Sequence, residues 1–201
     1  MHKIIRRGVM LSLLASSAYA DTPPSAPVVI DVATVNGSGC PAGTAAVDVS
    51  PGNAAFTITY SDYLAQVGPD AAPTEFRKNC QVSVAVHAPQ GFTYAIARAE
   101  YAGHAALAAG ATGLQRARYY FQGQQPTAVF SHPFAGPVDD DWVTTDVVDL
   151  SQLAFAPCGA QRNLNINTEL RVIAGTSDPA ATSWLAMDSE TIYHFVWQRC
   201  P

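Results

Sequence analysis

The sequence lacks the short motifs that mark several common catalytic and metal sites. It contains no C-x-x-C, H-x-H or H-E-x-x-H spacing and no G-x-S-x-G turn. These spacings place metal ligands or a nucleophile on one local element, so their absence removes the sequence signatures of zinc enzymes and of α/β-hydrolases. A catalytic triad assembled from distant segments leaves no such signature, and the sequence does not exclude one.

The apolar run near the N-terminus, residues 9–15, is far shorter than the roughly 20 residues that span a bilayer. It follows Lys3, Arg6 and Arg7 and precedes Ala18-Tyr19-Ala20, the order of a secretory signal with an A-x-A cleavage site. We therefore predict a signal peptide over residues 1–20 and a mature chain that begins at Asp21. No cysteine stands at position 21, and we expect no membrane anchor.

Basic residues are scarce after the predicted signal peptide. Eight lysines and arginines remain against sixteen acidic residues, a net charge of −8. A surface of that sign repels phosphate backbones, so we expect neither nucleic acid nor an anionic membrane as a partner. Cations and basic surfaces are accommodated more easily.

Cysteine is also rare, and its four copies are Cys40, Cys80, Cys158 and Cys200. An even number in an exported chain indicates disulfides, for which three pairings are possible. We expect Cys40–Cys80 and Cys158–Cys200, because each pair closes one half of the chain. Loops of about 40 residues correspond to roughly 4 kcal/mol of stabilisation per bridge in the chain-entropy account. The cysteines and the signal together predict a secreted or periplasmic protein.

Apolar and polar residues alternate along much of the chain, with glycine, proline and asparagine between the runs. In residues 80–86, for example, Cys80, Val82, Val84 and Val86 share one face. The pattern predicts strands in residues 55–63, 80–88, 91–103, 116–124, 140–150, 164–175 and 189–200. No internal repeat or long linker divides the chain. We therefore predict one all-β domain over residues 31–201, an antiparallel β-sandwich or flattened barrel, preceded by a lead-in at residues 21–30.

The alanine-rich stretch at residues 99–114 also fits a helix. Gly103, Gly110 and Gly113 would each cost about 1 kcal/mol in a helix interior. We therefore predict strands there, with small residues facing a packed neighbour.

Seven short segments occur in an order typical of one family. They are NGSGCPAGT at 36–44, SDY at 61–63, RKNCQ at 77–81, GPVDDDW at 136–142, PCG at 157–159, LNIN at 164–167 and WQRC at 197–200. Together they resemble the secreted family of fungi and bacteria catalogued as domain of unknown function 4360, across nearly all of the mature chain. The resemblance implies a small exported protein with two disulfides, and it implies no activity and no catalytic residue.

The most charged motif is GPVDDDW, where the consecutive carboxylates Asp139, Asp140 and Asp141 repel one another unless a positive charge lies between them. Calcium takes roughly six to eight oxygen ligands in flexible geometry, which a loop with neighbouring carboxylates and carbonyls can supply. We predict a candidate Ca²⁺ site in this loop, with Asp62 joining it from another loop. The spacing differs from that of an EF-hand, and the alternative is a solvated turn before a strand.

A second candidate site lies in the segment RARYYFQGQ. Alternation places Tyr120 on the same face as Arg116 and Arg118, with Tyr119 and Phe121 on the other face. An aromatic ring between two arginines can stack on a flat ligand, as in sugar or peptide recognition. The alternative is a strand with one solvated face.

These features predict a secreted, non-catalytic binding or structural protein, with Ca²⁺ as the candidate ion. We expect its partner to be a glycan, a cell-wall polymer or another extracellular protein. The alternative is a small secreted hydrolase that uses two facing carboxylates. The glutamates available for such a pair are Glu75, Glu100, Glu169 and Glu190.

Overall fold

The computed structural model describes residues 22–61, 63–125 and 128–201, without the side chains of residues 128, 188 and 189. The predicted signal peptide, the predicted N-terminus at Asp21 and the candidate ligand Asp62 lie outside the described residues. The described part of the chain forms eleven strands and two short 3-10 turns, Pro51–Asn53 and Leu150–Gln152. None of its helices is long and apolar enough to cross a membrane.

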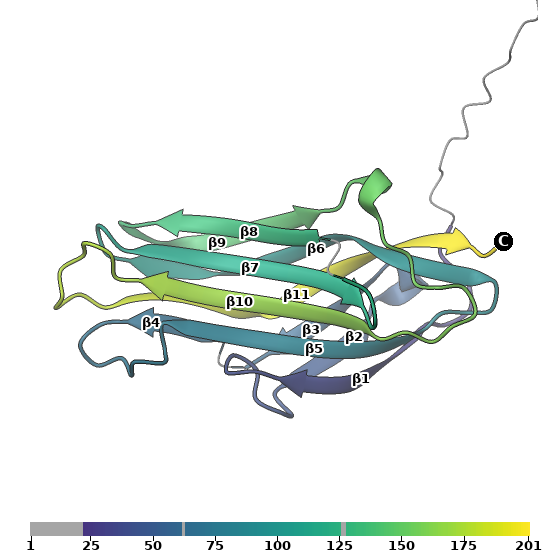
Figure 1. Ribbon diagram of the computed structural model, residues 1–201, viewed down its shortest axis with the longest axis horizontal. Coiled ribbons are helices and arrows are strands. Elements are labelled where there is room, and N and C mark those ends of the chain that lie inside the picture. The colour runs from purple at the N-terminus through teal and green to yellow at the C-terminus, as the bar shows by residue number, and fades with distance from the viewer. Residues whose placement is uncertain (1–21, 62, 126–127) are drawn as a thin grey trace, which may run out of the picture.

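One sheet has five strands in the order β1-β5-β10-β7-β8, and it lies in front in Figure 1. Each neighbouring pair in this sheet is antiparallel. The strands are β1 (Val29–Asn36), β5 (Arg77–His87), β10 (Leu164–Ile173), β7 (Thr112–Phe121) and β8 (Ala128–Ala135). Because β10 is central, its side chains have neighbours on both sides.

The other sheet has the order β2-β3-β11-β6-β9, with the short strand β4 paired to β11. All of these pairs are antiparallel as well. The strands are β2 (Ala45–Val49), β3 (Ala55–Tyr60), β4 (Leu64–Val67), β6 (Phe92–Leu107), β9 (Val138–Val147) and β11 (Ser183–Arg199). The two sheets lie one in front of the other (Figure 1), which confirms the prediction of an all-β antiparallel sandwich.

The core between the sheets follows the predicted alternation. The buried inner faces include Phe56, Ile58 and Tyr60 of β3 and Cys80, Val82, Val84 and Val86 of β5. Full burial of one large apolar side chain stabilises a fold by about 1.5–3 kcal/mol, so these strands supply much of the stability. Aromatic rings of β11 join the same cluster, as the ring centroids of Phe195 and Trp197 lie 5.1 Å apart.

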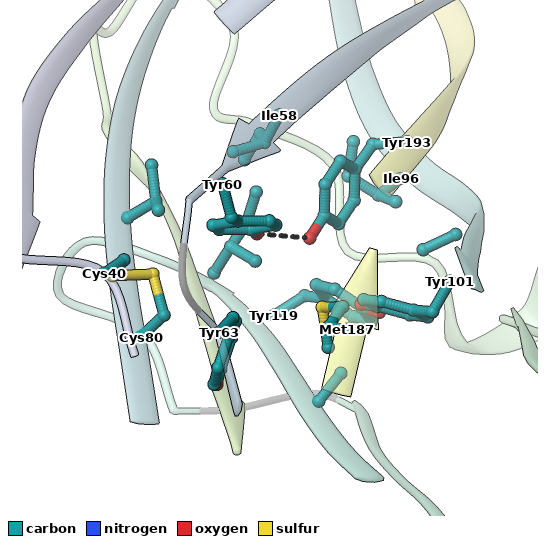
Figure 2. Packing of buried hydrophobic residues seen from close by; sticks show 14 of the residues in the cluster. Cys40, Ile58, Tyr60, Tyr63, Cys80, Ile96, Tyr101, Tyr119, Met187 and Tyr193 are labelled. Carbon is teal, nitrogen blue, oxygen red and sulfur yellow. Dashed lines mark hydrogen bonds between the residues drawn. A yellow bond between two sulfur atoms is a disulfide. The ribbon is translucent and has the colours of Figure 1, made fainter. Parts of the chain in front are cut away.

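A row of tyrosines crosses this core (Figure 2). The hydroxyls of Tyr60 and Tyr193 lie 3.5 Å apart, and the hydroxyl of Tyr101 is hydrogen-bonded to that of Tyr119. Tyr119 in turn donates to the buried carboxylate of Asp146. Burial raises the pKa of both Tyr101 and Tyr119 well above the ordinary value, so both phenols stay protonated. These four hydroxyls therefore have hydrogen-bond partners inside the core, whereas the hydroxyl of Tyr94 is buried without one among the described residues.

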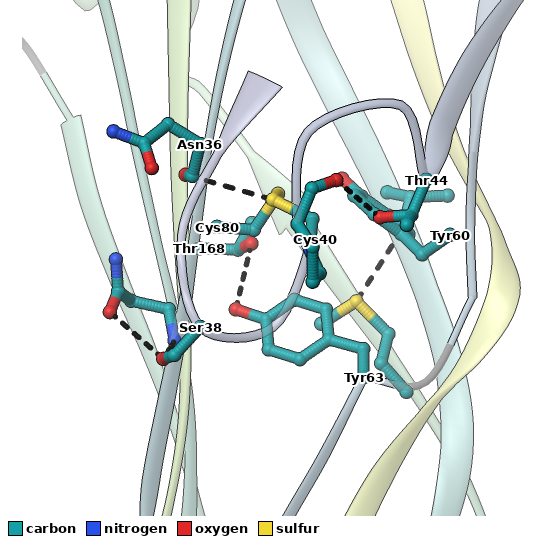
Figure 3. The surroundings of a disulfide bond; sticks show 12 residues. Asn36, Ser38, Cys40, Thr44, Tyr60, Tyr63, Cys80 and Thr168 are labelled. Carbon is teal, nitrogen blue, oxygen red and sulfur yellow. Dashed lines mark hydrogen bonds between the residues drawn. A yellow bond between two sulfur atoms is a disulfide. The ribbon is translucent and has the colours of Figure 1, made fainter.

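The predicted bridge between Cys40 and Cys80 is present, with the two Cα atoms 5.3 Å apart. It ties the segment after β1 to β5 in the five-stranded sheet. Figure 3 shows Tyr63 beside this bridge, with its hydroxyl 3.1 Å from the hydroxyl of Thr168 in β10. The bridge fixes the segment between β1 and β2, and the hydrogen bond holds Tyr63, just before β4, against the five-stranded sheet.

The predicted bridge between Cys158 and Cys200 is also present, with a Cα separation of 5.8 Å. The backbone N–H of Cys200 donates to the carbonyl of Gly91 at 2.9 Å. The end of β11 is therefore held both covalently and by the turn that precedes β6.

The alanine-rich stretch forms the end of β6 and the start of β7, as predicted. Gly103 shows why small residues are needed there. A Cβ atom at this position would lie 2.1 Å from the carbonyl oxygen of Ala186 and 2.5 Å from the Trp142 ring. Only glycine allows β6 to lie this close to its neighbours.

Asn53 anchors the chain before β1. Its Nδ2 donates to the carbonyls of Pro24 and Ala26 at 2.8 and 2.7 Å, and its Oδ1 accepts from the N–H of Val28 at 3.1 Å. Asn53 has a φ of 55°, a conformation that asparagine tolerates better than most residues. The extent of the domain, 31–201 after a lead-in at 21–30, stays a prediction, while β1 itself begins at Val29.

Candidate functional site

The outward-facing side chains of β5, β10 and β7 form one polar surface on the five-stranded sheet. We call it the arginine face and define it as Arg77, Asn79, Gln81, Arg116, Arg118, Tyr120, Asn167, Glu169 and Arg171. Strand pairing puts Asn79, Glu169 and Arg116 in one row. The next row is Gln81, Asn167 and Arg118. A shallow hollow lies over these two rows.

The alternation of each strand produces this surface. Leu170 of β10 and Ala117 of β7 are fully buried, so their neighbours in sequence, among them Glu169 and Arg118, face the other way. The sequence predicted this arrangement for Arg116, Arg118 and Tyr120 but not for the six residues on β5 and β10. Those residues are brought to the same surface by strand register, which the sequence does not show.

Glu169 holds two of the four arginines. Arg77 donates from Nε and Nη2 to Oε2 at 2.8 and 2.5 Å, and Arg171 donates from Nη2 to Oε1 at 2.6 Å. Partial burial by itself would raise the pKa of Glu169, but the two arginines outweigh it and the pKa lies below its ordinary value. Glu169 therefore stays ionised and neutralises part of the charge of Arg77 and Arg171.

Arg116 and Arg118 make fewer hydrogen bonds and ion pairs than Arg77 and Arg171. Arg116 donates from Nε to the hydroxyl of Ser131 at 3.2 Å, which leaves the rest of its guanidinium available. Within the part of the chain that the structure describes, no hydrogen bond or ion pair is found for Arg118, which is exposed. These two guanidinium groups are the donors that the arginine face offers to a ligand.

Two atoms of the arginine face are buried without a hydrogen-bond partner among the described residues, the Oδ1 of Asn167 and the Nε of Arg171. The amide nitrogen of Asn167 is used, because it donates to the hydroxyl of Tyr120 at 3.4 Å. A buried polar atom that lacks a partner costs about 1–3 kcal/mol. The arginine face therefore keeps two polar atoms whose hydrogen-bonding capacity is unused among the described residues.

The acidic residues Asp139, Asp140 and Asp141 lie within β9 rather than in a loop. The prediction of a loop is wrong because the pairing of β9 with β6 already begins at Val138, opposite Leu107. The repulsion between neighbouring carboxylates is reduced by the strand itself, which directs successive side chains to opposite faces.

His104 of β6 supplies the positive charge between two of these carboxylates. Its Nε2 lies 2.9 Å from Asp139 Oδ1 and its Nδ1 lies 2.8 Å from Asp141 Oδ1. The hydrogen bonds with Asp139 and then with Asp141 raise the pKa of His104 above the ordinary value. No group of three or more histidines, cysteines, aspartates or glutamates in the described residues is arranged to hold a metal ion. The Ca²⁺ site at Asp139, Asp140, Asp141 and Asp62 stays a prediction.

The other described histidines pair with carboxylates as well, which the sequence did not indicate. The Nε2 atoms of these histidines lie 2.6–2.8 Å from a carboxylate oxygen, in the pairs His87–Asp31, His132–Asp146 and His194–Glu100. The His132–Asp146 pair links β8 to β9, the edge strands of the two sheets. Burial raises the pKa of Asp146, although hydrogen bonds from His132 and Tyr119 favour its charged form.

The glutamates considered for a hydrolase are spread over the molecule. Glu169 faces outward from the five-stranded sheet, whereas Glu100 lies in the six-stranded sheet beside Arg98, 3.2 Å away. Glu75 lies between β4 and β5 and accepts a hydrogen bond from Gln66 at 2.6 Å. These three residues do not face one another across a cleft.

Two antiparallel sheets stapled by two disulfides define a small exported β-sandwich protein. The chain belongs to the family described as Domain of unknown function (DUF4360), which it matches over residues 26–200. A relative described as "Uncharacterized secreted protein", from Arthroderma benhamiae, is 36% identical over 172 residues, which cover 83% of this chain and 69% of the relative. The disulfides and the secreted relative confirm the prediction of a secreted or periplasmic protein.

Among solved structures, the enzymatically active domain of bacteriophage CBA120 tailspike protein 4 aligns with 86% of this chain and 19% of its own, at 12% identity and a TM-score of 0.26. The chain thus spans about a fifth of that protein. A likeness of this size supports no argument about fold or function.

Proposed function

We propose that this protein is a secreted, non-catalytic binding protein that holds its ligand on the arginine face. The observation that carries the proposal is the distribution of positive charge. Of the eight lysines and arginines after residue 20, the four on this face are Arg77, Arg116, Arg118 and Arg171. The chain as a whole is strongly acidic, so this face differs in charge from the rest of the molecule.

The clustering of these arginines works against stability. Arg171 lies directly opposite Arg77 in the strand pairing, and like charges in that position destabilise a sheet. Glu169 offsets this pair, but no carboxylate of the described residues pairs with Arg116 or Arg118. Local features that oppose folding are found most often at functional sites.

The side chains around the arginines suit a polar, flat ligand. Asn79, Gln81 and Asn167 offer both donors and acceptors, and Tyr120 adds an aromatic ring at the end of the face. The surface is built on three paired strands, so the backbone positions of these residues are fixed before a ligand arrives. Prior ordering of this kind reduces the entropy lost on binding.

The test is retention on insoluble extracellular polymers, with cellulose, chitin, pectin and peptidoglycan as the probes. We expect the oxidised protein to be retained by at least one of them, and the variant R116Q/R118Q/Y120A to be released. R98Q is the matched control, because Arg98 is an exposed arginine of the other sheet. Retention of the triple variant equal to that of the unchanged protein would contradict the proposal.

The same assay separates binding from hydrolysis and tests the calcium prediction. Soluble sugar or peptide released with turnover, and lost on replacing one glutamate by glutamine, would support the hydrolase alternative instead. Retention is measured both in EDTA and in calcium, since a cation at Asp139 and Asp141 would compete with the proton of His104 for these two carboxylates.

A further inference from the structure

We propose that the ligand of the arginine face is a polysaccharide that carries carboxylate groups, that is, a polymer containing uronic acids. This inference rests on the proposed function, because it names the chemical class of ligand for the same face.

The arginine face has a local charge opposite to that of the chain. It contains four arginines and the single carboxylate Glu169, a local net charge of +3, whereas the chain after residue 20 has a net charge of −8. An anionic ligand is therefore attracted to this face and repelled elsewhere. Charge complementarity of this kind selects both the sign of the ligand and the place where it binds.

The available positive groups have a fixed spacing. Arg116 and Arg118 are two residues apart on one strand, so their Cα atoms lie roughly 7 Å apart. Guanidinium groups bind carboxylates through two parallel hydrogen bonds, which fixes orientation as well as charge. Two such groups on a rigid strand suit carboxylates that are carried on separate rings of a polymer.

The groups beside the arginines favour a sugar over a phosphate polymer. The Oδ1 of Asn167 is an acceptor without a partner, and it is covered by its neighbours until a side chain moves. A phosphodiester or sulfate group has no proton to donate to it, whereas a sugar hydroxyl both donates and accepts. The amides of Asn79 and Gln81 and the ring of Tyr120 also match hydroxyls and a sugar ring.

A continuous polyanion such as nucleic acid fits the molecule less well. Its closely spaced phosphates would extend beyond the three strands of this face and meet the acidic remainder of the surface. A polysaccharide in which uronic acids alternate with neutral sugars avoids much of that repulsion.

The experiment is titration calorimetry of the oxidised protein in EDTA with size-matched soluble oligomers. The acidic probes are tetramers of galacturonate, mannuronate and hyaluronan, the neutral probe is tetragalactose, and the phosphate probe is short-chain polyphosphate. We expect at least one acidic tetramer to bind, and tetragalactose and polyphosphate to bind at least tenfold more weakly. R118Q should lower the affinity for that acidic tetramer about tenfold, the value of one charge-assisted pair, and R98Q should leave it unchanged.

Replacement of Glu169 should raise the affinity for the acidic tetramer, whereas R118Q should lower it. E169Q frees Arg77 and Arg171 from their carboxylate, so it should raise the affinity for the acidic tetramer several-fold. A structural role for these arginines would not produce such a gain. Circular dichroism at the titration temperature checks that each variant is folded.

The outcomes distinguish this inference from the proposed function. Binding of tetragalactose as tight as that of the acidic tetramers, with loss in R118Q, would overturn the acidic ligand and retain the face as the binding site. Binding of polyphosphate tighter than that of the acidic tetramers, with loss in R118Q, would likewise overturn the acidic sugar as ligand and retain the face as the binding site. Acidic binding that is unchanged in R116Q/R118Q would overturn both proposals. Absence of binding to all three acidic tetramers would overturn the inference, and the retention assay on solid polymers would then decide the proposed function separately.

Discussion

Single histidines pair with carboxylates at four separate places in the described residues. His104 does so twice, because Asp139 and Asp141 each bond to one of its ring nitrogens. Asp139 and Asp141 lie on the same face of β9, and a protonated imidazole between them offsets their repulsion. A metal ion at these carboxylates would therefore compete with the proton of His104 for their charge.

The first prediction concerns the charge of His104. We expect its pKa to lie above the ordinary value of 6.5 and to fall in both D139N and D141N. Since the pKa is raised in the folded state, the pair stabilises the fold below the unfolded pKa, and this contribution is lost as the pH rises through the folded pKa. NMR titration of the imidazole protons measures the pKa of His104, with His87 as the control in each variant. A pKa for His104 at or below 6.5 would contradict the geometry.

At the scale of elements, the strand β10 determines how charge is distributed over the five-stranded sheet. It is the central strand, and its residue Glu169 is the carboxylate that separates Arg77 of β5 from Arg116 and Arg118 of β7. The second prediction is that E169Q lowers the free energy of unfolding by about 1–3 kcal/mol at neutral pH, because two charge-assisted pairs are lost.

The pH dependence of E169Q follows from the lowered pKa of Glu169. The stabilisation by the Glu169–arginine pairs is fully present above the pKa of Glu169 in the unfolded chain. It disappears as the pH falls through the lower pKa of the folded state, because Glu169 is then protonated and uncharged, like the glutamine of E169Q. Urea unfolding at neutral and at strongly acidic pH should therefore show a difference that shrinks on acidification. E190Q, which removes an exposed carboxylate of β11, serves as the control, and a difference independent of pH would contradict this account.

The third prediction tests the acidic strand β9 for calcium. The calcium hypothesis predicts a higher midpoint of thermal unfolding in calcium than in EDTA at a pH where His104 is neutral. At a calcium concentration about a hundred times the dissociation constant, the shift would be on the order of 5–10 °C. D139N/D140N/D141N should abolish the shift. An unchanged midpoint in the unchanged protein would leave Asp139 and Asp141 as partners of His104 alone.

Several elements could be predicted from alternation and others could not. The long strands β5 and β10 both lie where alternation predicted them, and the predicted inner face of β5, from Cys80 to Val86, is buried. The strands β2 and β4 have only five and four residues, too few for a period to stand out, and β8 contains Pro133, which argues against a strand. The loop expected at Asp139 became a strand because backbone pairing with β6 overrides local charge.

The arginine face could be predicted only in part. Arg116, Arg118 and Tyr120 lie on one strand, where period two fixes their common side. Arg77 and Arg171 come from strands far away in the sequence, and their place beside Glu169 depends on the register of β5 and β7 against β10. A single sequence carries no direct record of register. The same reason explains why every histidine–carboxylate pair was missed.

At the scale of the whole molecule, the disulfides act at different points of the sandwich. The fourth prediction is that C158S/C200S lowers the free energy of unfolding by up to roughly 4 kcal/mol, because the bridge closes a loop of 42 residues. The end of β11 should then exchange its amide hydrogens faster, while β5 keeps its protection. C40S/C80S should reverse this pattern. Equal exchange at the C-terminus with and without Cys158–Cys200 would show that pairing with β6 alone holds the strand.

A molecule whose one cationic face is set on a strongly anionic body has a large electric dipole. Near a negatively charged matrix, such a molecule rotates so that the arginine face arrives first, and the encounter is faster than random orientation allows. Mobile ions weaken this orientation over a screening length of roughly 8–10 Å. The association rate should therefore fall steeply with ionic strength while the dissociation rate changes little, and the protein would be captured most rapidly in dilute surroundings.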